Sequence, residues 1–562
     1  MSVNDTPIWT THYNHPTLWD QAFAALTLPA MLDASVARAP DAIFSDFLGA
    51  RLSYAQVGQW VDRFAAGMQA LGLARGDRIG LFLPNVPAYP IAYYGALKAG
   101  ALVVNLSPLY TVDELAHQIG DSGARTIVTC DVPQLYAAAK ALLDRGAVDR
   151  IVVGSLSGWM PPLKRALFRL FKRGQIARIS RDDSRIVNFE ALLADTTMPS
   201  VPVALAADDV ALIQYTGGTT GVPKGAMLTH QNLTANARQV DAIDPEHIAP
   251  DRILGVLPFF HVFANTCVLN RTVLRGGMIA MLPRFDAAMT LATLHRVQAT
   301  ALPGVPTMYQ ALLDHPHTAK TDFSSLRVCI SGGAPLPAEV KAKFEAMTGA
   351  RVVEGYGLTE SAGVVSTNPY AALNKPGTIG QPIPGTRVML ADKEDPTRPP
   401  PPGEPGELLV AGPQMMKGYW HHPEADAGLF VGEWLRTGDV AEIDADGYIR
   451  IVDRLKDMIA VGGFKVFPSQ IEAVLYRNPS VKEALVIGIP DTYHGEMPKA
   501  FVTLAEDATM DGEMLKAWLN PLVGKHERVT AVEVRESLPK TLVGKLSRKE
   551  LVAEERAKAA AA

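Results

Sequence analysis

Hydrophobic and polar residues alternate with two different periods between Asp46 and Pro384. Residues 55–70 and 112–122 repeat apolar side chains at helical spacing, whereas 78–82 and 125–129 are short runs rich in apolar and β-branched residues. This alternation of helix and strand predicts a largely parallel sheet covered by helices. Several of the expected strands end in glycine-rich turns, where α/β proteins tend to place their ligands.

The pattern changes after Asp453, where the expected elements become shorter. The apolar runs there predict strands at 458–461, 484–489, 500–504 and 531–535, and helices at 469–476, at 512–519 and from Ser547. Because 562 residues exceed what one hydrophobic core usually holds, we expect at least two domains. The predicted fold is α/β, with a large multi-sheet N-terminal domain at 1–453 and a small α+β C-terminal domain at 454–562.

Local signals bear on some of these boundaries. Ser469 and Ser547 each precede a glutamate by three residues, which is the spacing of a capping box at the start of a helix. The proline-rich stretch 395–406 has two interpretations, a surface loop or a domain boundary. The shift to shorter elements comes later than this stretch, so we place the boundary after Asp453.

The bulk composition is that of an ordinary globular protein, with 48% hydrophobic and 20% charged residues. The formal net charge of −5 gives no electrostatic reason to expect nucleic-acid binding. The 3 cysteines lie far apart in the sequence, which suits a reducing compartment better than a disulfide framework or a zinc site. The N-terminus does not resemble a secretory signal, and the most apolar stretch, 87–106, predicts a buried helix and a strand rather than a membrane span. We therefore expect a cytoplasmic protein.

The segment Leu163–Arg173 departs from the globular pattern. Leu163, Leu167, Leu170 and Phe171 follow helical spacing, and lysine or arginine fills five of the other positions. Two interpretations stay open at this point. The segment is a surface helix whose apolar stripe docks on its own domain, or it is a basic amphipathic helix that rests on an anionic membrane surface. In the second case the protein is peripheral at the inner face of the membrane.

The most informative stretch is 215–225, with the sequence YTGGTTGVPKG. It follows an apolar run at 210–214 that predicts a strand, and it precedes 227–240, which we expect to form a helix. Closely spaced glycines permit a tight backbone path with N–H groups turned inward, and a proline before Lys224 rules out a Walker A loop. The stretch predicts a polyphosphate site formed by Thr216, Gly217, Gly218, Thr219, Thr220, Gly221 and Lys224.

This loop resembles the phosphate-binding motif of the adenylate-forming superfamily, which comprises acyl-CoA synthetases, luciferases and the adenylation domains of peptide synthetases. Other motifs of the superfamily follow in order, namely SGGAPL at 331–336, GYGLTE at 355–360, TGD at 437–439, DRLKDM at 453–458 and PKTLVGK at 539–545. The resemblance runs from about Pro40 to about Leu551. It implies that ATP and a carboxylic acid form an acyl-adenylate with the help of Mg²⁺, and that CoA then takes the acyl group.

The resemblance also implies roles for single residues. Lys545 would be catalytic and bridge the carboxylate and the α-phosphate, while Glu360 would bind Mg²⁺ and Thr359 would touch the phosphates. Asp439 would accept both ribose hydroxyls, and Arg454 would contact the ribose or a phosphate. The remaining nucleotide-binding residues, which include those around the adenine, would be Gly332, Gly333, Ala334, Gly355, Tyr356 and Gly357.

Lys456 matches the hinge position on which the small domain rotates in this superfamily. Rotation would withdraw Lys545 after adenylation and present Gly462 and Gly463, where a backbone without side chains lets the thiol arm of CoA pass. Ala460 stands where several relatives have lysine, and Gly462 where serine is common. These departures leave the fine geometry of the CoA site open.

The acid is expected to be apolar. Residues 257–265 correspond to a stretch in which an amino-acid-activating enzyme needs a carboxylate, and they contain none. Apolar residues there and at 362–364 predict a pocket for an alkyl chain, whose transfer from water contributes roughly 0.8 kcal/mol per CH₂. The predicted pocket residues are His261, Phe263, Ala362 and Gly363, and His261 is either at the pocket mouth or a buried structural residue.

Within the superfamily the chain most resembles bacterial long-chain fatty-acid–CoA ligases, through YTGGTTG and through Val104–Thr111. The resemblance implies an acid–thiol ligase that converts a fatty acid, ATP and CoA to acyl-CoA, AMP and PPi. Two alternatives stay open: a CoA ligase for medium-chain, aryl or dicarboxylic acids, and a non-catalytic nucleotide-binding or membrane-adaptor protein. The protein is expected to be a monomer or a homodimer, and the sequence does not fix the acyl chain length.

Overall fold

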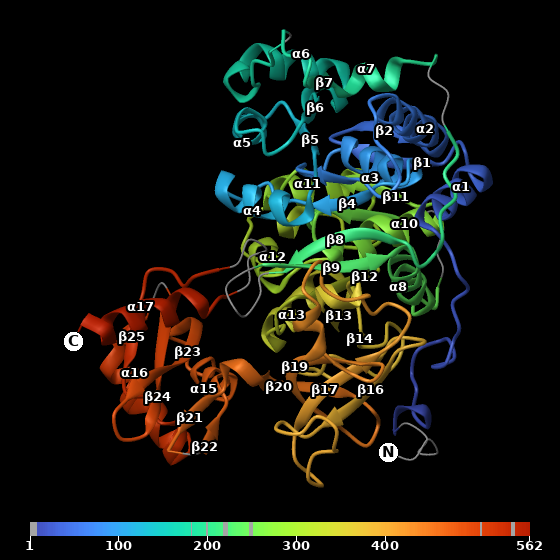
Figure 1. Cartoon of the computed structure of the whole chain (residues 1–562). Coiled ribbons are helices and arrows are strands. Elements are labelled where there is room, and N and C mark those ends of the chain that lie inside the picture. Colours follow the sequence, from blue (N-terminus) through green and yellow to red (C-terminus); the bar gives the residue numbers. More distant parts are fainter. Residues whose placement is uncertain are drawn as a thin grey trace. The chain divides into compact units, whose positions relative to one another are not determined.

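The computed structural model describes residues 8–180, 182–197, 201–216, 223–246, 251–462, 464–505, 508–540 and 546–561. The chain forms two compact units. Figure 1 labels their helices and strands and colours the chain by position in the sequence. Unit 1 comprises Met1–Arg387 and Ala411–Phe430, and unit 2 comprises Val388–Val410 and Val431–Ala562. The domain boundary expected after Asp453 stays a prediction.

A seven-stranded sheet forms one layer of unit 1. Its neighbours are parallel except at one edge, where β8 and β9 are antiparallel. In spatial order the strands are β7 (Ile186–Asn188), β6 (Arg150–Gly154), β5 (Thr126–Cys130), β3 (Arg78–Leu81), β4 (Leu102–Asn105), β8 (Val210–Thr216) and β9 (Lys224–Thr229). Strands that are covered on both faces require continuous apolar runs, and every residue of β5 is buried.

Helices alternate with these strands along the chain. They are α2 (Tyr54–Ala70), α3 (Ala88–Lys98), α4 (Val112–Ser122), α5 (Pro133–Asp144), α6 (Pro162–Phe171) and α7 (Phe189–Ala194). Helix α3 is buried along almost its whole length, because Gly95 lets α2 approach so closely that a Cβ there would lie 2.7 Å from Phe64 Cδ1. This burial accounts for the apolar stretch 87–106, which forms a helix and a strand as predicted. No helix in the described part of the chain combines the length and the hydropathy needed to cross a membrane.

Two four-stranded sheets complete the β-structure of unit 1. The first has the order β10 (Arg252–Gly255), β11 (Met278–Met281), β1 (Ile43–Phe47) and β2 (Ala50–Ser53). The second has the order β12 (Val328–Gly332), β13 (Arg351–Tyr356), β14 (Ser366–Thr367) and β15 (Gln381–Pro382). Their helices are α1 (Leu28–Arg38), α8 (His230–Ala242), α9 (Val262–Ala264), α10 (Arg271–Arg275), α11 (Ala287–Val297), α12 (Pro306–Leu313) and α13 (Ala338–Thr348).

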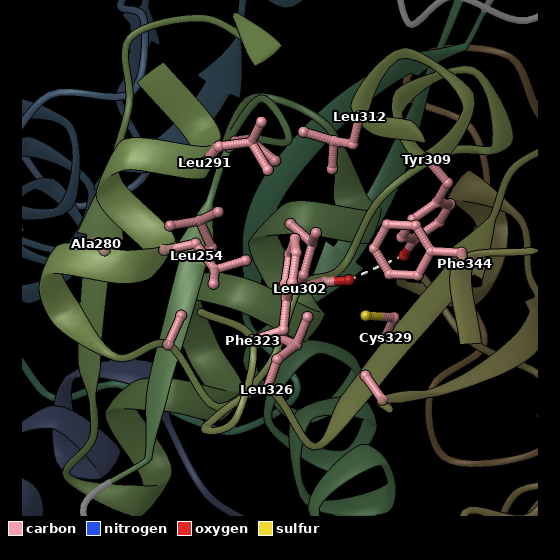
Figure 2. Close-up of a cluster of buried hydrophobic side chains, with 14 of the residues drawn as sticks. Leu254, Ala280, Leu291, Leu302, Tyr309, Leu312, Phe323, Leu326, Cys329 and Phe344 are labelled. Carbon is pink, nitrogen blue, oxygen red and sulfur yellow. Dashed lines mark hydrogen bonds between the residues drawn. The ribbon is translucent and has the colours of Figure 1, made fainter. Parts of the chain in front are cut away.

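A hydrophobic cluster holds these two sheets and three of the helices together. It includes Leu254 of β10, Leu291 of α11, Tyr309 of α12 and Phe344 of α13, all at most 1% exposed. Figure 2 shows the Tyr309 hydroxyl pointing to the Leu302 carbonyl oxygen, to which it donates a hydrogen bond of 2.9 Å. The ring thereby stays in the apolar cluster while its polar end is satisfied.

Unit 2 contains two five-stranded sheets. One consists of β16 (Arg387–Ala391), β17 (Gly406–Ala411), β19 (Trp434–Ile443) and β18 (Phe430–Val431), with β20 (Ile449–Arg454) paired to β19. The other consists of β22 (Phe464–Val466), β21 (Ile459–Val461), β24 (Gly495–Leu504) and β23 (Val481–Asp491), with β25 (Val532–Val534) paired to β24. Helices α15 (Pro468–Leu475), α16 (Gly512–Leu519) and α17 (Lys549–Ala561) accompany the second sheet. The predicted α/β class, with several sheets in the large part and a small α+β part at the end, is confirmed.

Two local predictions are wrong. The segment after the glycine loop begins as strand β9 rather than as a helix at 227, because it pairs with β8, and α8 begins only at His230, where Thr229 and Asn232 form a capping box. Ser469 does not cap α15, since Phe467 is the N-cap residue and the Ser469 hydroxyl donates instead to the Val452 carbonyl oxygen at 2.5 Å. The proline-rich stretch 395–406 lies mostly in a loop between β16 and β17, as one of its two interpretations expected.

Candidate functional site

The predicted phosphate loop joins the two antiparallel strands at the edge of the seven-stranded sheet. Thr216 at the end of β8 is paired with Lys224 at the start of β9, so these two residues form the stem of the loop. Gly217, Gly218, Thr219, Thr220 and Gly221 lie outside the described residues. Residues 417–420 cover the outer side of β9. Trp420 N donates to Gly225 O at 2.7 Å, and Met227 N donates to Gly418 O at 2.9 Å.

Tyr419 brings two predicted site residues together at this stem. Its hydroxyl donates to Glu360 Oε1 at 2.6 Å, and the Lys224 ammonium lies over its ring, 5.5 Å from the centroid. Burial and the neighbouring Glu360 carboxylate raise the pKa of Tyr419 well above its ordinary value, so the phenol keeps the proton that it donates. The backbone adds a further restraint, because Met416 N donates to Glu360 O at 2.8 Å.

A second tyrosine fixes the other strand of the stem. Tyr215 of β8 donates its hydroxyl to Asp121 Oδ2 at 2.5 Å, and the indole N–H of Trp420 donates to Asp121 O at 3.2 Å. Asp121 belongs to α4, so the stem is tied to the body of unit 1 from both of its strands. The loop therefore emerges from a rigid base, which suits the positioning of a polyphosphate.

The predicted adenine residues meet on neighbouring parallel strands. Gly332 at the end of β12 is in register with Gly355 of β13, and Gly333 follows in the left-handed backbone region at φ 86°. A Cβ at Gly332 would lie 3.1 Å from the ring of Phe263, so the nucleotide strand and a predicted acyl-pocket residue are in contact. Ala334 and Tyr356, the other predicted adenine neighbours, are both partly exposed.

The turn after Glu360 is tightly constrained. A Cβ at Gly357 would lie 1.7 Å from the carbonyl oxygen of Gly363, so only glycine fits there. Ala362 is buried with a left-handed φ of 55°, an uncommon conformation for a residue with a side chain. Thr266 Oγ1 donates to Ala362 O at 2.6 Å, and the Asn236 side chain donates to Val364 O at 2.8 Å, which together hold the turn.

His261 lies at the start of the helical segment that carries Phe263. Its Nδ1 accepts a hydrogen bond from Phe263 N at 3.3 Å, and the side chain is partly exposed. The segment continues as a π-helix over Asn265–Asn270, a conformation that is frequent at functional sites. The structure thus places His261 and Phe263 on one short element, and Ala362 and Gly363 on the turn that contacts it.

In unit 2, Asp439 and Arg454 form an ion pair. They are opposite each other on β19 and β20, with Arg454 Nε 3.0 Å from Asp439 Oδ1. The Asp439 side chain is 3% exposed and that of Arg454 is 50% exposed. The two residues that were expected at the ribose are therefore neighbours, and the guanidinium restrains the carboxylate from the solvent side.

The predicted hinge and CoA residues follow directly on β20. Desolvation and then the Arg454 charge lower the pKa of Lys456, which is an exposed residue. Its neighbour Asp457 pairs with Arg548 at 3.0 Å, and Arg548 also pairs with Glu472 of α15 at 2.6 Å. Gly462 has a left-handed φ of 57° and donates its N–H to His494 O at 2.8 Å. Gly463 and Lys545 lie outside the described residues.

The expected Mg²⁺ can be tested against the donor set. No group of three or more His, Cys, Asp or Glu side chains gathers into a metal site within the described ranges. Mg²⁺ in nucleotide enzymes commonly uses only one or two carboxylates and takes its other ligands from phosphates and water. Glu360, partly exposed and held at one oxygen by Tyr419 beside the phosphate-loop stem, fits that pattern. Thr359 lies in the same short 3₁₀ helix.

Sequence reasoning missed the residues that hold the site in place. Tyr419 and Asp121 belong to no expected motif, although the Gly-Tyr-Trp cluster at 418–420 is a signal that an aromatic group lies near a tight turn. Asn236 and Thr266 lie on helices whose patterns show only that those faces are buried. Their partners are 59 to 128 positions away in the sequence, so the local pattern carries no sign of the pairing.

The fold is that of an α/β protein whose predicted phosphate loop joins the two antiparallel strands at the edge of its largest sheet. A family model described as AMP-binding enzyme matches residues 32–420, and one described as AMP-binding enzyme C-terminal domain matches 470–545. The chain belongs to the AMP-binding enzyme family.

Named relatives agree with this assignment. The chain is 39% identical to a long-chain-fatty-acid--CoA ligase of Bacillus subtilis over 551 residues, which are 97% of this chain and 98% of the relative. It is 38% identical to a feruloyl-CoA synthase of Amycolatopsis sp, over 90% of this chain and 94% of the relative. Among solved structures it resembles ATP-bound MatB from Rhodopseudomonas palustris, with a TM-score of 0.81, 29% identity, and coverage of 94% of this chain and 99% of MatB.

Proposed function

We propose that this chain is an ATP-dependent long-chain fatty acid:CoA ligase, an acid–thiol ligase that acts through an acyl-adenylate. The observation that carries the proposal is the cluster of Glu360, Tyr419 and Lys224 at the base of the phosphate loop. The Glu360 carboxylate, which we assign to Mg²⁺, and the Lys224 ammonium, which we assign to the phosphates, both contact this tyrosine. Nearly full-length likeness to relatives named long-chain-fatty-acid--CoA ligase supports the same function.

In the first step a carboxylate oxygen of the acid attacks the α-phosphorus of ATP, and the bond to the β-phosphate oxygen breaks to release PPi. Both reactants are anions, so catalysis depends on neutralising their charge and holding them in line. Lys224 serves the phosphates and Lys545 bridges the carboxylate and the α-phosphate. Mg²⁺ held by Glu360 would supply positive charge to the phosphate oxygens.

In the second step the thiol sulfur of CoA attacks the acyl carbonyl carbon, AMP leaves with its phosphate oxygen, and the thiol proton passes to solvent. Asp439 holds the ribose through both hydroxyls, and Arg454 keeps that carboxylate in place. Rotation at Lys456 would exchange Lys545 for the segment of the sequence that contains Gly462 and Gly463. Gly462 presents backbone without a side chain, as a narrow passage for the thiol arm requires.

The acid pocket favours an apolar chain. Phe259, Phe260 and Val262 are all at most 9% exposed, and Phe263 lies against Gly332. No Asp or Glu occurs at 257–265, so a positively charged group on the acid would have no partner from this segment.

An aryl acid is the second candidate, because a polar network lies behind the helical segment 262–270. The Tyr93 hydroxyl donates to Asn265 Oδ1 at 3.3 Å, and Tyr94 donates to Asn270 Oδ1 at 2.7 Å. The buried Asn265 Nδ2 has no hydrogen-bond partner among the described residues. Such a donor would suit a hydroxyl or methoxy group on a ring, and one relative is named feruloyl-CoA synthase.

The test is AMP release with CoA, ATP and a series of acids that includes palmitate, octanoate, benzoate, ferulate and malonate. We expect the highest kcat/KM with palmitate. A preference for ferulate would shift the assignment to the aryl candidate, and Asn265→Leu should then lower kcat/KM for ferulate more than for palmitate. Absence of AMP release with every acid would refute the ligase assignment.

We also propose that the enzyme is cytoplasmic, acts as a monomer or homodimer, and contacts the inner face of the membrane peripherally through α6. Its substrate makes such contact useful, because long-chain acids partition into bilayers at roughly 0.8 kcal/mol per CH₂. Recruitment of the enzyme to that surface would raise the local concentration of its acid.

A further inference from the structure

Helix α6 presents its apolar side outward. The four large apolar side chains of the stripe are exposed, at 73% for Leu163, 46% for Leu167, 61% for Leu170 and 73% for Phe171. The helix has no buried residue. An apolar stripe that packed on its own domain would be covered, so the surface-helix interpretation of the sequence is wrong in its essential point.

The basic side of α6 faces the protein instead. Arg165 Nη2 donates to Gly158 O at 2.7 Å, Arg169 Nε donates to Ser157 Oγ at 3.2 Å, and Lys164 Nζ donates to Leu48 O at 2.8 Å. At 100° per residue, Arg165 and Arg169 lie opposite the stripe of leucines. The helix is thus anchored by its cations on Ser157–Trp159, which inverts the usual arrangement of a surface helix.

The surroundings of the stripe are strongly basic. Six Lys or Arg residues and no Asp or Glu occur between Met160 and Ile179, in a chain whose formal net charge is −5. Two of them, Lys172 and Arg173, are exposed directly after Phe171. A surface that combines exposed leucines with adjacent cations is complementary to a bilayer interface with anionic headgroups, where acyl chains take the apolar residues and phosphates take the cations.

We propose that α6 docks on an anionic lipid surface by inserting its Leu163–Leu167–Leu170–Phe171 stripe, while Lys172 and Arg173 contact the headgroups. The proposal rests on the peripheral membrane contact in the proposed function and specifies its geometry. Because the cations on the opposite side are bonded to the protein, the attachment to the bilayer comes from insertion of the stripe. Lys172 and Arg173 add the preference for anionic lipid.

The first test is flotation of the purified full-length protein with vesicles of phosphatidylcholine and phosphatidylglycerol at 7:3. We expect wild-type protein to float, and Leu167→Glu to lower the bound fraction at least tenfold. Met347→Glu is the matched control, because Met347 lies on helix α13 and is also 46% exposed, and it should bind as wild type does. Wild-type protein that stays unbound, or equal binding by the two variants, would overturn the proposal.

The second test reports on insertion directly. All three cysteines are buried, so an environment-sensitive fluorophore can be attached selectively at Leu170→Cys or at Met347→Cys. We expect a blue shift on vesicle addition for the dye at 170 and none for the dye at 347. Lys172→Glu with Arg173→Glu should reduce binding to anionic vesicles at least fivefold and leave binding to pure phosphatidylcholine unchanged.

Three further outcomes separate this proposal from others. Leu167→Glu and Met347→Glu should keep wild-type ligase rates with detergent-dispersed palmitate, since neither residue belongs to the nucleotide or acyl site. If the wild-type protein releases no AMP with any acid but still floats with vesicles, the ligase function is refuted and the lipid-binding proposal stands. A dimer in sedimentation experiments that Leu167→Glu abolishes, with no vesicle binding by the wild type, would assign the stripe to a second copy and overturn the proposal.

Discussion

The hydroxyl of Tyr419 donates a hydrogen bond to Glu360 at 2.6 Å. This bond leaves Oε2 of Glu360 outside the contact and fixes the rotamer of the carboxylate. The ring also separates that carboxylate from the Lys224 ammonium on its face. A tyrosine in this place keeps two opposite charges apart, and the proposed function assigns each of them to a different part of Mg²⁺·ATP.

Tyr419→Phe removes the donor and keeps the ring. A hydrogen bond to a charged group contributes about 1.5–3 kcal/mol, so we expect adenylation, measured as ATP–PPi exchange, to fall roughly 10- to 100-fold. The Mg²⁺ concentration for half-maximal rate should rise as well. Tyr215→Phe removes an equally short bond, to Asp121, on the other strand of the stem, and it should lower stability without shifting the Mg²⁺ requirement. Identical Mg²⁺ curves for both variants would contradict the positioning role.

Gly357→Ala should disable the turn after Glu360. The new Cβ would lie 1.7 Å from Gly363 O, and the turn cannot move without breaking its bonds to Asn236 and Thr266. We expect a loss of at least about 3 kcal/mol in unfolding free energy, or an inactive site in a shifted loop. Gly120→Ala in α4 is the control, because nothing lies within 4 Å of its Cβ. It should be neutral or stabilise by about 0.5–1 kcal/mol.

Glu354 makes the stability of unit 1 depend on pH. Burial raises the pKa of this carboxyl to about 7, although Leu336 N–H, 3.1 Å from Oε1, acts in the opposite direction. The folded state therefore retains a proton that the unfolded chain loses near its ordinary pKa. This contribution to stability is present at low pH and is lost as pH rises through about 7, by at most about 3 kcal/mol.

Thermal midpoints of wild type and Glu354→Gln check this dependence. Between pH 5.5 and pH 8 the wild type should lose more stability than the variant, because glutamine does not titrate. The difference between the two proteins isolates Glu354 from the other titrating groups. A wild-type midpoint that falls no more than the variant's would contradict the raised pKa.

Lys545→Ala should separate the two half-reactions. We expect adenylation to fall at least about 10³-fold, since a point charge at the reacting phosphate is lost. Thioester formation from preformed acyl-adenylate and CoA should stay within about threefold of wild type, because the domain rotation would have withdrawn this lysine. Equal losses in both half-reactions would refute the assigned role, and Lys540→Ala, in the same motif, serves as the control.

How far the sequence predicts this molecule depends on where each signal lies. Helices α2 and α4 and strand β3 were predictable within a residue or two, because each shows its own hydrophobic period. Strand β9 was not, since its partner β8 decides its conformation and its six residues have no period of their own. The site follows the same rule: Glu360 and Lys224 belong to local motifs, whereas Tyr419 joins them only through a contact across 59 positions.

The amphipathic segment illustrates a different limit. The spacing of Leu163, Leu167 and Leu170 predicted the helix and its two faces, and α6 has both. Which face meets the protein depends on acceptors at Leu48, Ser157 and Gly158, and nothing in the helix itself specifies them. Periodicity thus defines a stripe but does not indicate what the stripe faces.

The strand order of the large sheet has a consequence for how an acid travels. Helix α6 is bonded to the residues that follow β6, next to the edge strand β7, whereas the phosphate loop leaves the opposite edge at β9. Five strand spacings of 4.7–4.9 Å separate β6 from β9, which is roughly 24 Å. That span exceeds the length of an extended palmitoyl chain, so an acid cannot remain anchored in the lipid at α6 while its carboxylate reacts. Helix α6 would thus attach the enzyme to the bilayer without guiding the acid to the active site. Each acid must then leave the bilayer completely before it is activated.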